Sequence, residues 1–172
     1  MGYDLHIERQ PPGGWKKWNA EHTPVALQQK LSATEDDELQ LKISEQIRAT
    51  LAREKAAVGL LITTAEWIKA VQETPGIRLA TKDANLKTST GDVLSFKHRP
   101  EDVEVLAQDG DWRMAILFRR GTATFSGRAW EPGHPVAIAA CRLAKATHAK
   151  IVGDEGEEYP LLPGAEGARK SG

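Results

Sequence analysis

The sequence predicts an α+β fold, an antiparallel sheet of about four or five strands with helices packed on one face and one appended amphipathic helix. Three observations support this prediction. Apolar and polar residues alternate at the start of the chain and again between residues 103 and 126, which is the period of half-buried strands. Apolar residues recur at helical spacing within 36–57, 64–73 and 135–148. An Asp-Gly pair lies where two of the strands would be joined as a hairpin.

The first element is expected to be a strand. Tyr3, Leu5 and Ile7 alternate with polar residues, so one face of this strand would be buried. A proline and glycine cluster at 11–14 ends it. Residues 15–24 show no period, and we expect a turn or loop there.

The appended helix is expected over 36–57. Its apolar residues recur every four positions: Leu39, Ile43, Ile47 and Leu51. Thr34 is available as an N-cap, and acidic residues fill the first turn. Leu39, Leu41 and Ile43 also alternate as they would in a strand, so a part-strand is the alternative.

The helix over 64–73 carries a clear start signal. Thr63 and Glu66 fit the capping box, in which the hydroxyl and the carboxylate each accept a hydrogen bond from a free backbone N–H. The helix is expected to continue through Trp67 and to stop before Pro75-Gly76.

A meander of three antiparallel strands is expected between residues 103 and 126. Asp109-Gly110 forms the first hairpin turn, and residues 119–121 turn the chain into a third strand over 122–126. Large side chains of the second strand are expected on a single face: Trp112, Met114, Ile116 and Phe118.

The remaining elements complete one domain. Pro135 fits the first turn of a helix over 135–148 whose small apolar residues allow close packing on a sheet. A short strand at 150–152 and an acidic turn at 153–158 follow. We expect a single α+β domain over 1–162 with an insertion at about 18–58, followed by a flexible C-terminal tail at 163–172.

Composition excludes several classes of protein. Hydrophobic residues make up 40% and charged residues 27%, as in ordinary globular proteins. The 23 basic residues balance 24 acidic ones, so no global field attracts nucleic acid or an anionic membrane. Only Cys141 is present, so no intrachain disulfide can form, and we find no export signal or long apolar run. We therefore expect a cytoplasmic protein.

Three segments together resemble a widespread group of small, uncharacterised bacterial proteins. They are the opening Tyr3-Asp4-Leu5-His6-Ile7, the helix start from Thr63 to Val71, and the closing Gly153-Asp154-Glu155-Gly156-Glu157. The stretch from Trp18 to Val58 departs from that pattern and resembles an insertion. Proteins of this kind often accompany toxin or effector genes, so the resemblance implies immunity to a cognate toxin as the function.

Two surfaces are candidates for binding a protein partner: the tryptophan segment together with the 36–57 helix, and the acidic turn. Trp15 and Trp18 flank two lysines in a glycine-rich segment, and aromatic anchors supply much of the energy of protein interfaces. Folding back onto their own domain is the alternative for these rings. Ile43 and Ile47 on the 36–57 helix would dock on the sheet, a second copy in a homodimer, or a foreign partner.

The acidic turn is the second candidate surface. Its carboxylates are Asp154, Glu155, Glu157 and Glu158. A structural turn, a partner-facing patch and a hard-cation site are the three interpretations, but the EF-hand ladder is absent.

We expect no catalytic residue, no metal site and no cofactor, because the common catalytic and nucleotide motifs are absent. Two alternative functions remain. A small metal-dependent hydrolase would use His6, Asp4 and the acidic turn. A nucleic-acid-binding module would use the arginine-bearing hairpin, whose basic residues are Arg113, Arg119, Arg120 and Arg128.

Overall fold

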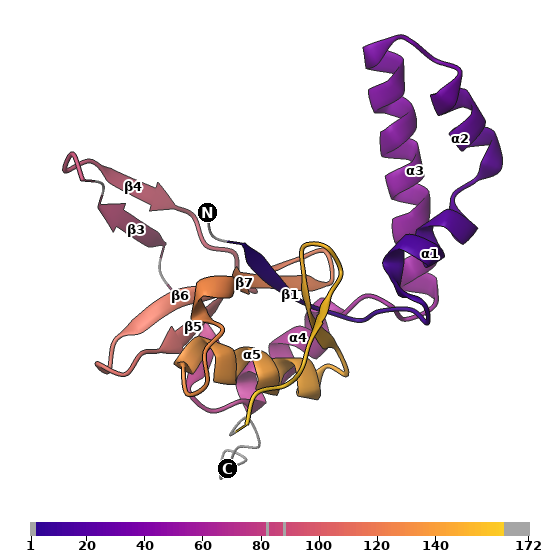
Figure 1. The fold of residues 1–172 in the computed structure, drawn as a ribbon. Coiled ribbons are helices and arrows are strands. Elements are labelled where there is room, and N and C mark those ends of the chain that lie inside the picture. Colours follow the sequence, from indigo (N-terminus) through magenta and orange to yellow (C-terminus); the bar gives the residue numbers. More distant parts are fainter. Residues whose placement is uncertain (1–2, 82, 88, 164–172) are drawn as a thin grey trace. The chain divides into compact units, whose positions relative to one another are not determined.

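The computed structural model describes residues 3–81, 83–87 and 89–163. Their contacts separate the chain into two units. One unit comprises the chain up to Arg9 and from Ile62 onward, and the other comprises Gln10–Leu61 (Figure 1). Apart from Pro163, the predicted C-terminal tail lies outside the described residues.

The first unit is built on an antiparallel sheet. Within the described residues this sheet has seven strands, in the order β2-β5-β6-β7-β1-β8-β9. Their bounds are β1 (Asp4–Glu8), β2 (Ile77–Leu79), β5 (Val103–Leu106), β6 (Trp112–Arg119), β7 (Thr122–Ser126), β8 (Lys150–Gly153) and β9 (Glu158–Tyr159). The α+β class and the antiparallel sheet are confirmed. The strand count exceeds the predicted four or five because β2 and β9 are too short to show a period.

Two further strands, β3 (Ala84–Lys87) and β4 (Val93–Phe96), pair with each other as a separate two-stranded sheet.

The topology of the main sheet places the first strand of the chain near its centre. β1 pairs with β7 on one side and β8 on the other, so the N-terminal strand closes the sheet between elements that come late in the sequence.

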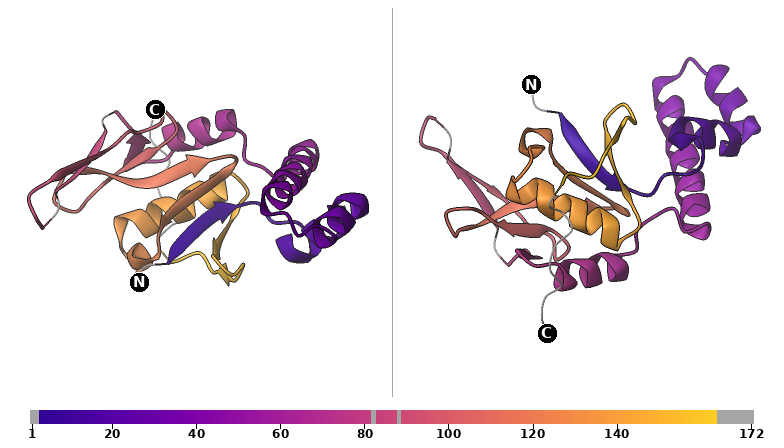
Figure 2. Two further views of the ribbon diagram at one scale, coloured as in Figure 1. Left: turned by 90° about the horizontal axis from the view of Figure 1, so that it is seen from above. Right: turned by 60° about the horizontal axis from the view of Figure 1, so that its bottom comes forward.

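Two helices, α4 (Thr64–Glu73) and α5 (Pro135–Ala146), cover the same face of the sheet, as predicted (Figure 2). The capping box at the start of α4 is confirmed, because Thr63 Oγ1 accepts from the Glu66 N–H at 3.2 Å and Glu66 Oε2 accepts from the Thr63 N–H at 2.9 Å. The helix η1 (Gly127–Ala129) follows β7.

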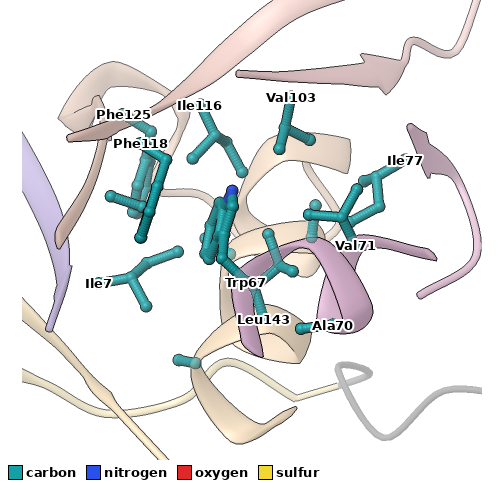
Figure 3. Close-up of a cluster of buried hydrophobic side chains, with 14 of the residues drawn as sticks. Ile7, Trp67, Ala70, Val71, Ile77, Val103, Ile116, Phe118, Phe125 and Leu143 are labelled. Atoms are coloured by element: carbon teal, nitrogen blue, oxygen red, sulfur yellow. The ribbon is translucent and has the colours of Figure 1, made fainter. Parts of the chain in front are cut away.

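The main core lies between this helical layer and the sheet (Figure 3). The Trp67 ring is fully buried and stacks on Phe118 at a centroid distance of 4.8 Å. Its Nε1–H donates to the Glu101 carbonyl at 2.8 Å, which satisfies the one polar group of the side chain. Leu143 of α5 and Ile116 of β6 are buried in the same cluster.

The register of β5 and β6 corrects one prediction. Val103 pairs with Ile116, but Glu104 pairs with Met114, so Ala115 is an extra residue in β6. A bulge of this kind moves the residues on its two sides to opposite faces of the sheet. The prediction that Trp112, Met114, Ile116 and Phe118 share one face is therefore wrong. Ile116 and Phe118 face the core, and Trp112 and Met114 lie on the other face.

The second unit is helical. Its helices are α1 (Gly14–His22), α2 (Val25–Ser32) and α3 (Asp37–Ala57). The helix α3 confirms the prediction for 36–57 and excludes the part-strand. Its N-cap is Asp36 and not the predicted Thr34, because the Asp36 side chain accepts a hydrogen bond from the Leu39 N–H at 3.0 Å. The expectation of a loop at 15–24 is wrong, because α1 occupies most of it.

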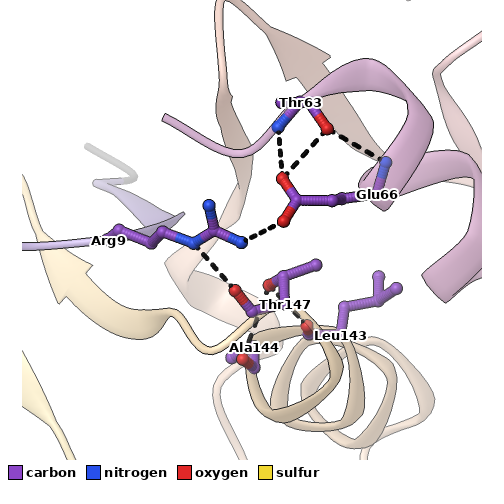
Figure 4. Close-up of polar contacts among 6 residues, drawn as sticks. All are labelled: Arg9, Thr63, Glu66, Leu143, Ala144 and Thr147. Atoms are coloured by element: carbon purple, nitrogen blue, oxygen red, sulfur yellow. Dashed lines mark hydrogen bonds and ion pairs between the residues drawn. The ribbon is translucent and has the colours of Figure 1, made fainter. Parts of the chain in front are cut away.

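Arg9 anchors the chain where it leaves the sheet unit (Figure 4). Its guanidinium donates to the Thr147 carbonyl at the end of α5 at 3.0 Å and to Glu66 Oε1 at the start of α4 at 2.8 Å. At the return point, the Ile62 N–H donates to the Gly121 carbonyl at 3.2 Å, and the Ile62 side chain is buried. The chain is therefore held by hydrogen bonds within the sheet unit both where it leaves this unit and where it returns to it.

Candidate functional site

The two tryptophans of the predicted partner surface lie together in the helical unit. Their rings meet edge to face at 5.7 Å, a favoured geometry for aromatic pairs. The Trp18 ring also stacks on His22 at 4.0 Å, and Lys55 Nζ lies 4.3 Å from the Trp15 ring centroid and 5.7 Å from that of Trp18. Because residues three and four apart share one helix face, Trp15, Trp18 and His22 meet on one side of α1.

This cluster gives the tryptophans different exposures. Trp18 is only 8% exposed, whereas Trp15 is half-buried. The cation over both rings comes from the last turns of α3, so the cluster joins α1 to α3. Trp18 thus stabilises the helical unit, and Trp15 keeps part of its surface open.

Most of the apolar stripe of α3 is buried or half-buried. Ile43 and Leu51 are buried, and Ile47 is half-buried. The helix contacts α2 and α1 within its unit. Ile43 therefore has little surface left for a partner in this state of the chain.

Another part of α3 is exposed and apolar. Leu39 is 47% exposed and Leu41 is 56% exposed. Both follow directly on four exposed acidic residues at 35–38. The start of α3 therefore presents two leucines beside a concentrated negative charge.

Sequence reasoning missed Leu41 as a surface residue, although a signal was present. Leu41 departs from the four-residue spacing of the apolar stripe, and its alternation with Leu39 and Ile43 also matches the pattern of a strand. On a helix, a leucine outside the buried stripe is instead an exposed one.

The acidic turn between β8 and β9 is held by its own side chains. Asp154 Oδ1 forms a hydrogen bond with His6 Nε2 at 2.7 Å, and Asp154 Oδ2 accepts a hydrogen bond from the Asp4 N–H at 3.3 Å. Glu157 Oε2 accepts from the Glu155 N–H at 3.1 Å, and Glu158 pairs with Lys150 at 2.8 Å. Most of these carboxylates therefore serve the turn itself.

Gly153 permits this arrangement. A Cβ at this position would overlap the Glu157 carboxylate, so glycine lets this carboxylate lie against the backbone. The hydrogen bond from His6, followed by that from the Asp4 N–H, lowers the pKa of Asp154 below its ordinary value. The ionised form of the Asp154 carboxylate is consequently favoured by its neighbours in β1.

His6 connects this turn to the middle of the sheet. Its Nδ1 lies 3.1 Å from Thr124 Oγ1, while Nε2 contacts Asp154. The sheet register explains this line of three groups, since Thr124 of β7 lies directly opposite His6 and Val152 of β8 lies opposite it on the other side. A proton could be transferred along the line formed by the Asp154 carboxylate, the His6 imidazole and the Thr124 hydroxyl. Asp4, which the hydrolase alternative also uses, contributes its backbone N–H to this line and not its carboxylate.

The residues of the alternative functions are mostly engaged in structural contacts. Within the described ranges, no cluster of three or more histidine, cysteine or acidic side chains is arranged to hold a metal ion. Arg113 pairs with Asp109, and Arg119 pairs with the buried Asp102. Arg120 and Arg128 are exposed.

Comparisons with models of protein families, with curated proteins and with solved structures give no match to this chain. In the part of the chain that the structure describes, no helix has both the length and the apolar character needed to cross a membrane.

Proposed function

We propose that this chain is a non-catalytic binding protein whose helical unit binds a basic protein partner, most concretely a bacterial toxin or effector that it neutralises. The observation that carries the proposal is the exposed start of α3, where Leu39 and Leu41 follow the acidic residues 35–38. Exposed apolar side chains rimmed by charge are typical of protein interfaces.

The charge of this surface favours a basic partner. Of the four adjacent carboxylates, Glu38 pairs with Lys42 at 2.8 Å and Asp36 caps α3. The net negative charge that remains would attract a positively charged protein over a distance of about 8 Å at physiological salt and would repel an acidic one. Trp15, half-buried against Lys55, extends the apolar surface of the same unit. The acidic turn gives less support, because most of its carboxylates bind groups within the sheet unit.

The resemblance to immunity-type proteins adds the identity of the partner class. A toxin acting on nucleic acid or other polyanions would carry the basic surface that this interface needs. The inhibitor would need no chemistry of its own, only tight occlusion of that surface. This agrees with the expectation of no catalytic residue.

The test uses the proteins encoded beside this chain in its host. Each is co-expressed with the full chain, and complexes are measured by titration calorimetry. We expect micromolar or tighter binding that weakens with added salt, and restored growth of cells that express the toxin. The variant with Leu39→Ser and Leu41→Ser is expected to lose binding, and Val58→Ser, which changes another exposed apolar residue of the same unit, is expected to keep it.

Two results would contradict the proposal. One is the absence of any partner at micromolar concentration. The other is light scattering that reveals a dimer dissolved by the two leucine substitutions, because a second copy of the chain would then be the occupant of this surface.

A further inference from the structure

A cavity of about 380 Å³ lies between the β5–β6 hairpin and the first turn of α5, within the sheet unit. Its apolar lining is Val105, Ala107, Ala115, Pro135 and Val136. Its polar lining is Gln108, Asp109, Arg113 and His134. The volume is at the lower end of the range for small-molecule sites, which is roughly 300–1,000 Å³.

The β-bulge in β6 creates this site. Because Ala115 is an extra residue, Arg113 pairs in register with Val105, which is a core residue, and the two side chains therefore share the helix-covered side of the sheet. A regular strand would have placed Arg113 on the opposite face. The bulge thus brings a guanidinium to an apolar cavity.

Arg113 already holds a carboxylate at this position. Its Nη2 pairs with Asp109 Oδ2, and the two side chains are 63% and 50% exposed. Asp109 Oδ1 accepts from the Asp111 N–H at 3.1 Å, so the hairpin turn fixes the carboxylate. A guanidinium has five N–H donors, and this contact uses only part of them.

His134 supplies a second donor. Its Nδ1 accepts from the Val136 N–H at 3.2 Å, so the neutral ring carries its proton on Nε2. The cavity therefore combines an apolar wall with two groups that donate hydrogen bonds. A ligand that matches it has an acceptor with negative charge at one end and a compact apolar body.

We propose that this cavity binds a small organic carboxylate, with the carboxylate on Arg113 and the apolar body against Val105, Ala115 and Val136. Asp109 acts as a resident competitor, because it is itself a carboxylate on the same guanidinium. This site is separate from the partner surface of the helical unit, and the failure of either proposal leaves the other unaffected.

The test is a titration of the isotope-labelled full chain with benzoate, followed by the backbone amide signals of Ala107, Arg113 and Val136. We expect saturable shifts at millimolar benzoate, and binding of the neutral analogue benzamide that is weaker by about tenfold or more, because hydrogen bonds to a charged group are the stronger kind. Arg113→Gln is expected to weaken benzoate binding by about the same factor.

Asp109→Asn gives the sharpest result. Its amide oxygen can still accept from the Asp111 N–H, so the turn is kept while the competing charge is removed. We expect benzoate to bind several-fold more tightly. Arg48→Gln, which removes an exposed positive charge in α3, is the matched control and should not change the affinity.

Equal binding of benzoate and benzamide would overturn the proposal, as would unchanged benzoate affinity in both Arg113→Gln and Asp109→Asn. Inorganic phosphate that shifts the same signals with the affinity of benzoate would also overturn it, since the apolar wall would then contribute nothing. The spectra of the variants report their folding directly, so a loss of binding is distinguished from a loss of structure.

Discussion

Trp67 is the largest fully buried side chain among the described residues. It is fully buried, stacks on Phe118 and donates to the Glu101 carbonyl. Trp67→Ala removes these contacts and leaves a cavity, so we expect the free energy of unfolding to fall by about 3–5 kcal/mol in urea titrations. Leu117→Ala, which changes an exposed residue on the other face of the sheet, should cost only about 0.5 kcal/mol. Equal losses would show that this ring is not the centre of the core.

Asp102 is a buried carboxylate whose charge is balanced by its neighbours. Burial alone would raise its pKa, but the hydrogen bonds from Arg119 and from the Arg99 N–H, together with the charge of Arg119, lower it overall. A second backbone donor, the Phe118 N–H, lies 3.3 Å from Oδ1. These contacts therefore favour the ionised form of the Asp102 carboxyl group in the folded chain.

The lowered pKa fixes the sign of a pH effect. The contribution of Asp102 to stability is complete above its ordinary value in the unfolded chain and is lost as the pH falls through its lower value in the folded chain. Asp102→Asn should cost about 3 kcal/mol near neutral pH, the low end for a broken buried pair, since Arg119 is partly exposed. Unfolding titrations at decreasing pH should show this difference shrinking, and a constant difference would exclude the ionised carboxylate as its source.

The start of α4 is stabilised by a chain of polar contacts at the scale of a whole element. The hydrogen bond from Arg9, followed by that from the Thr63 N–H, lowers the pKa of Glu66 to about 2. The carboxylate therefore stays ionised down to acidic pH, and its contribution is lost as the pH falls from its ordinary value of 4.5 toward about 2.

Removing the cap tests this element directly. Thr63→Ala should lower the free energy of unfolding by about 1 kcal/mol, because the Glu66 N–H loses its acceptor. Thr64→Ala, one residue further along and exposed, is the matched control and should have little effect. Since alanine is the better helix former, Thr64→Ala should not destabilise α4, and a similar loss in both variants would mean that the cap does not account for the change.

Elements with a local signal could be predicted from the sequence. The capping box located α4, the Asp109-Gly110 turn located the β5–β6 hairpin, and the four-residue spacing located α3. In each case the physical cause lies within a few residues of the element. The face covered by α4 and α5 followed from their apolar stripes.

Elements that depend on distant residues could not be predicted. The helix α1 is stabilised by Lys55, which lies more than thirty positions beyond it in sequence. The strand β2 has three residues and is defined by its pairing with β5. The bulge at Ala115 appears only in the register of two strands, so alternation alone assigned Trp112 and Met114 to the wrong face.

The candidate sites show the same limit at the scale of the whole molecule. Composition identified Trp15 and Trp18 as unusual, but their different exposures follow from packing within the helical unit. The acidic turn was recognised as a cluster of charge, yet its contact with His6 joins residues almost 150 positions apart. The cavity beside Arg113 has no sequence signature, because it depends on the bulge.

The division into two units predicts that a core substitution acts on one unit only. Trp18 is buried in the helical unit and Trp67 in the sheet unit. Local opening follows such separately packed units, and amide hydrogen exchange reports it. We expect Trp18→Ala to accelerate exchange in α1, α2 and α3 while β1, β6 and α5 keep their protection, and Trp67→Ala to give the reverse pattern. Faster exchange throughout the chain in both variants would instead make the molecule one cooperative unit, and the helical unit could then no longer be treated as a separate binding module.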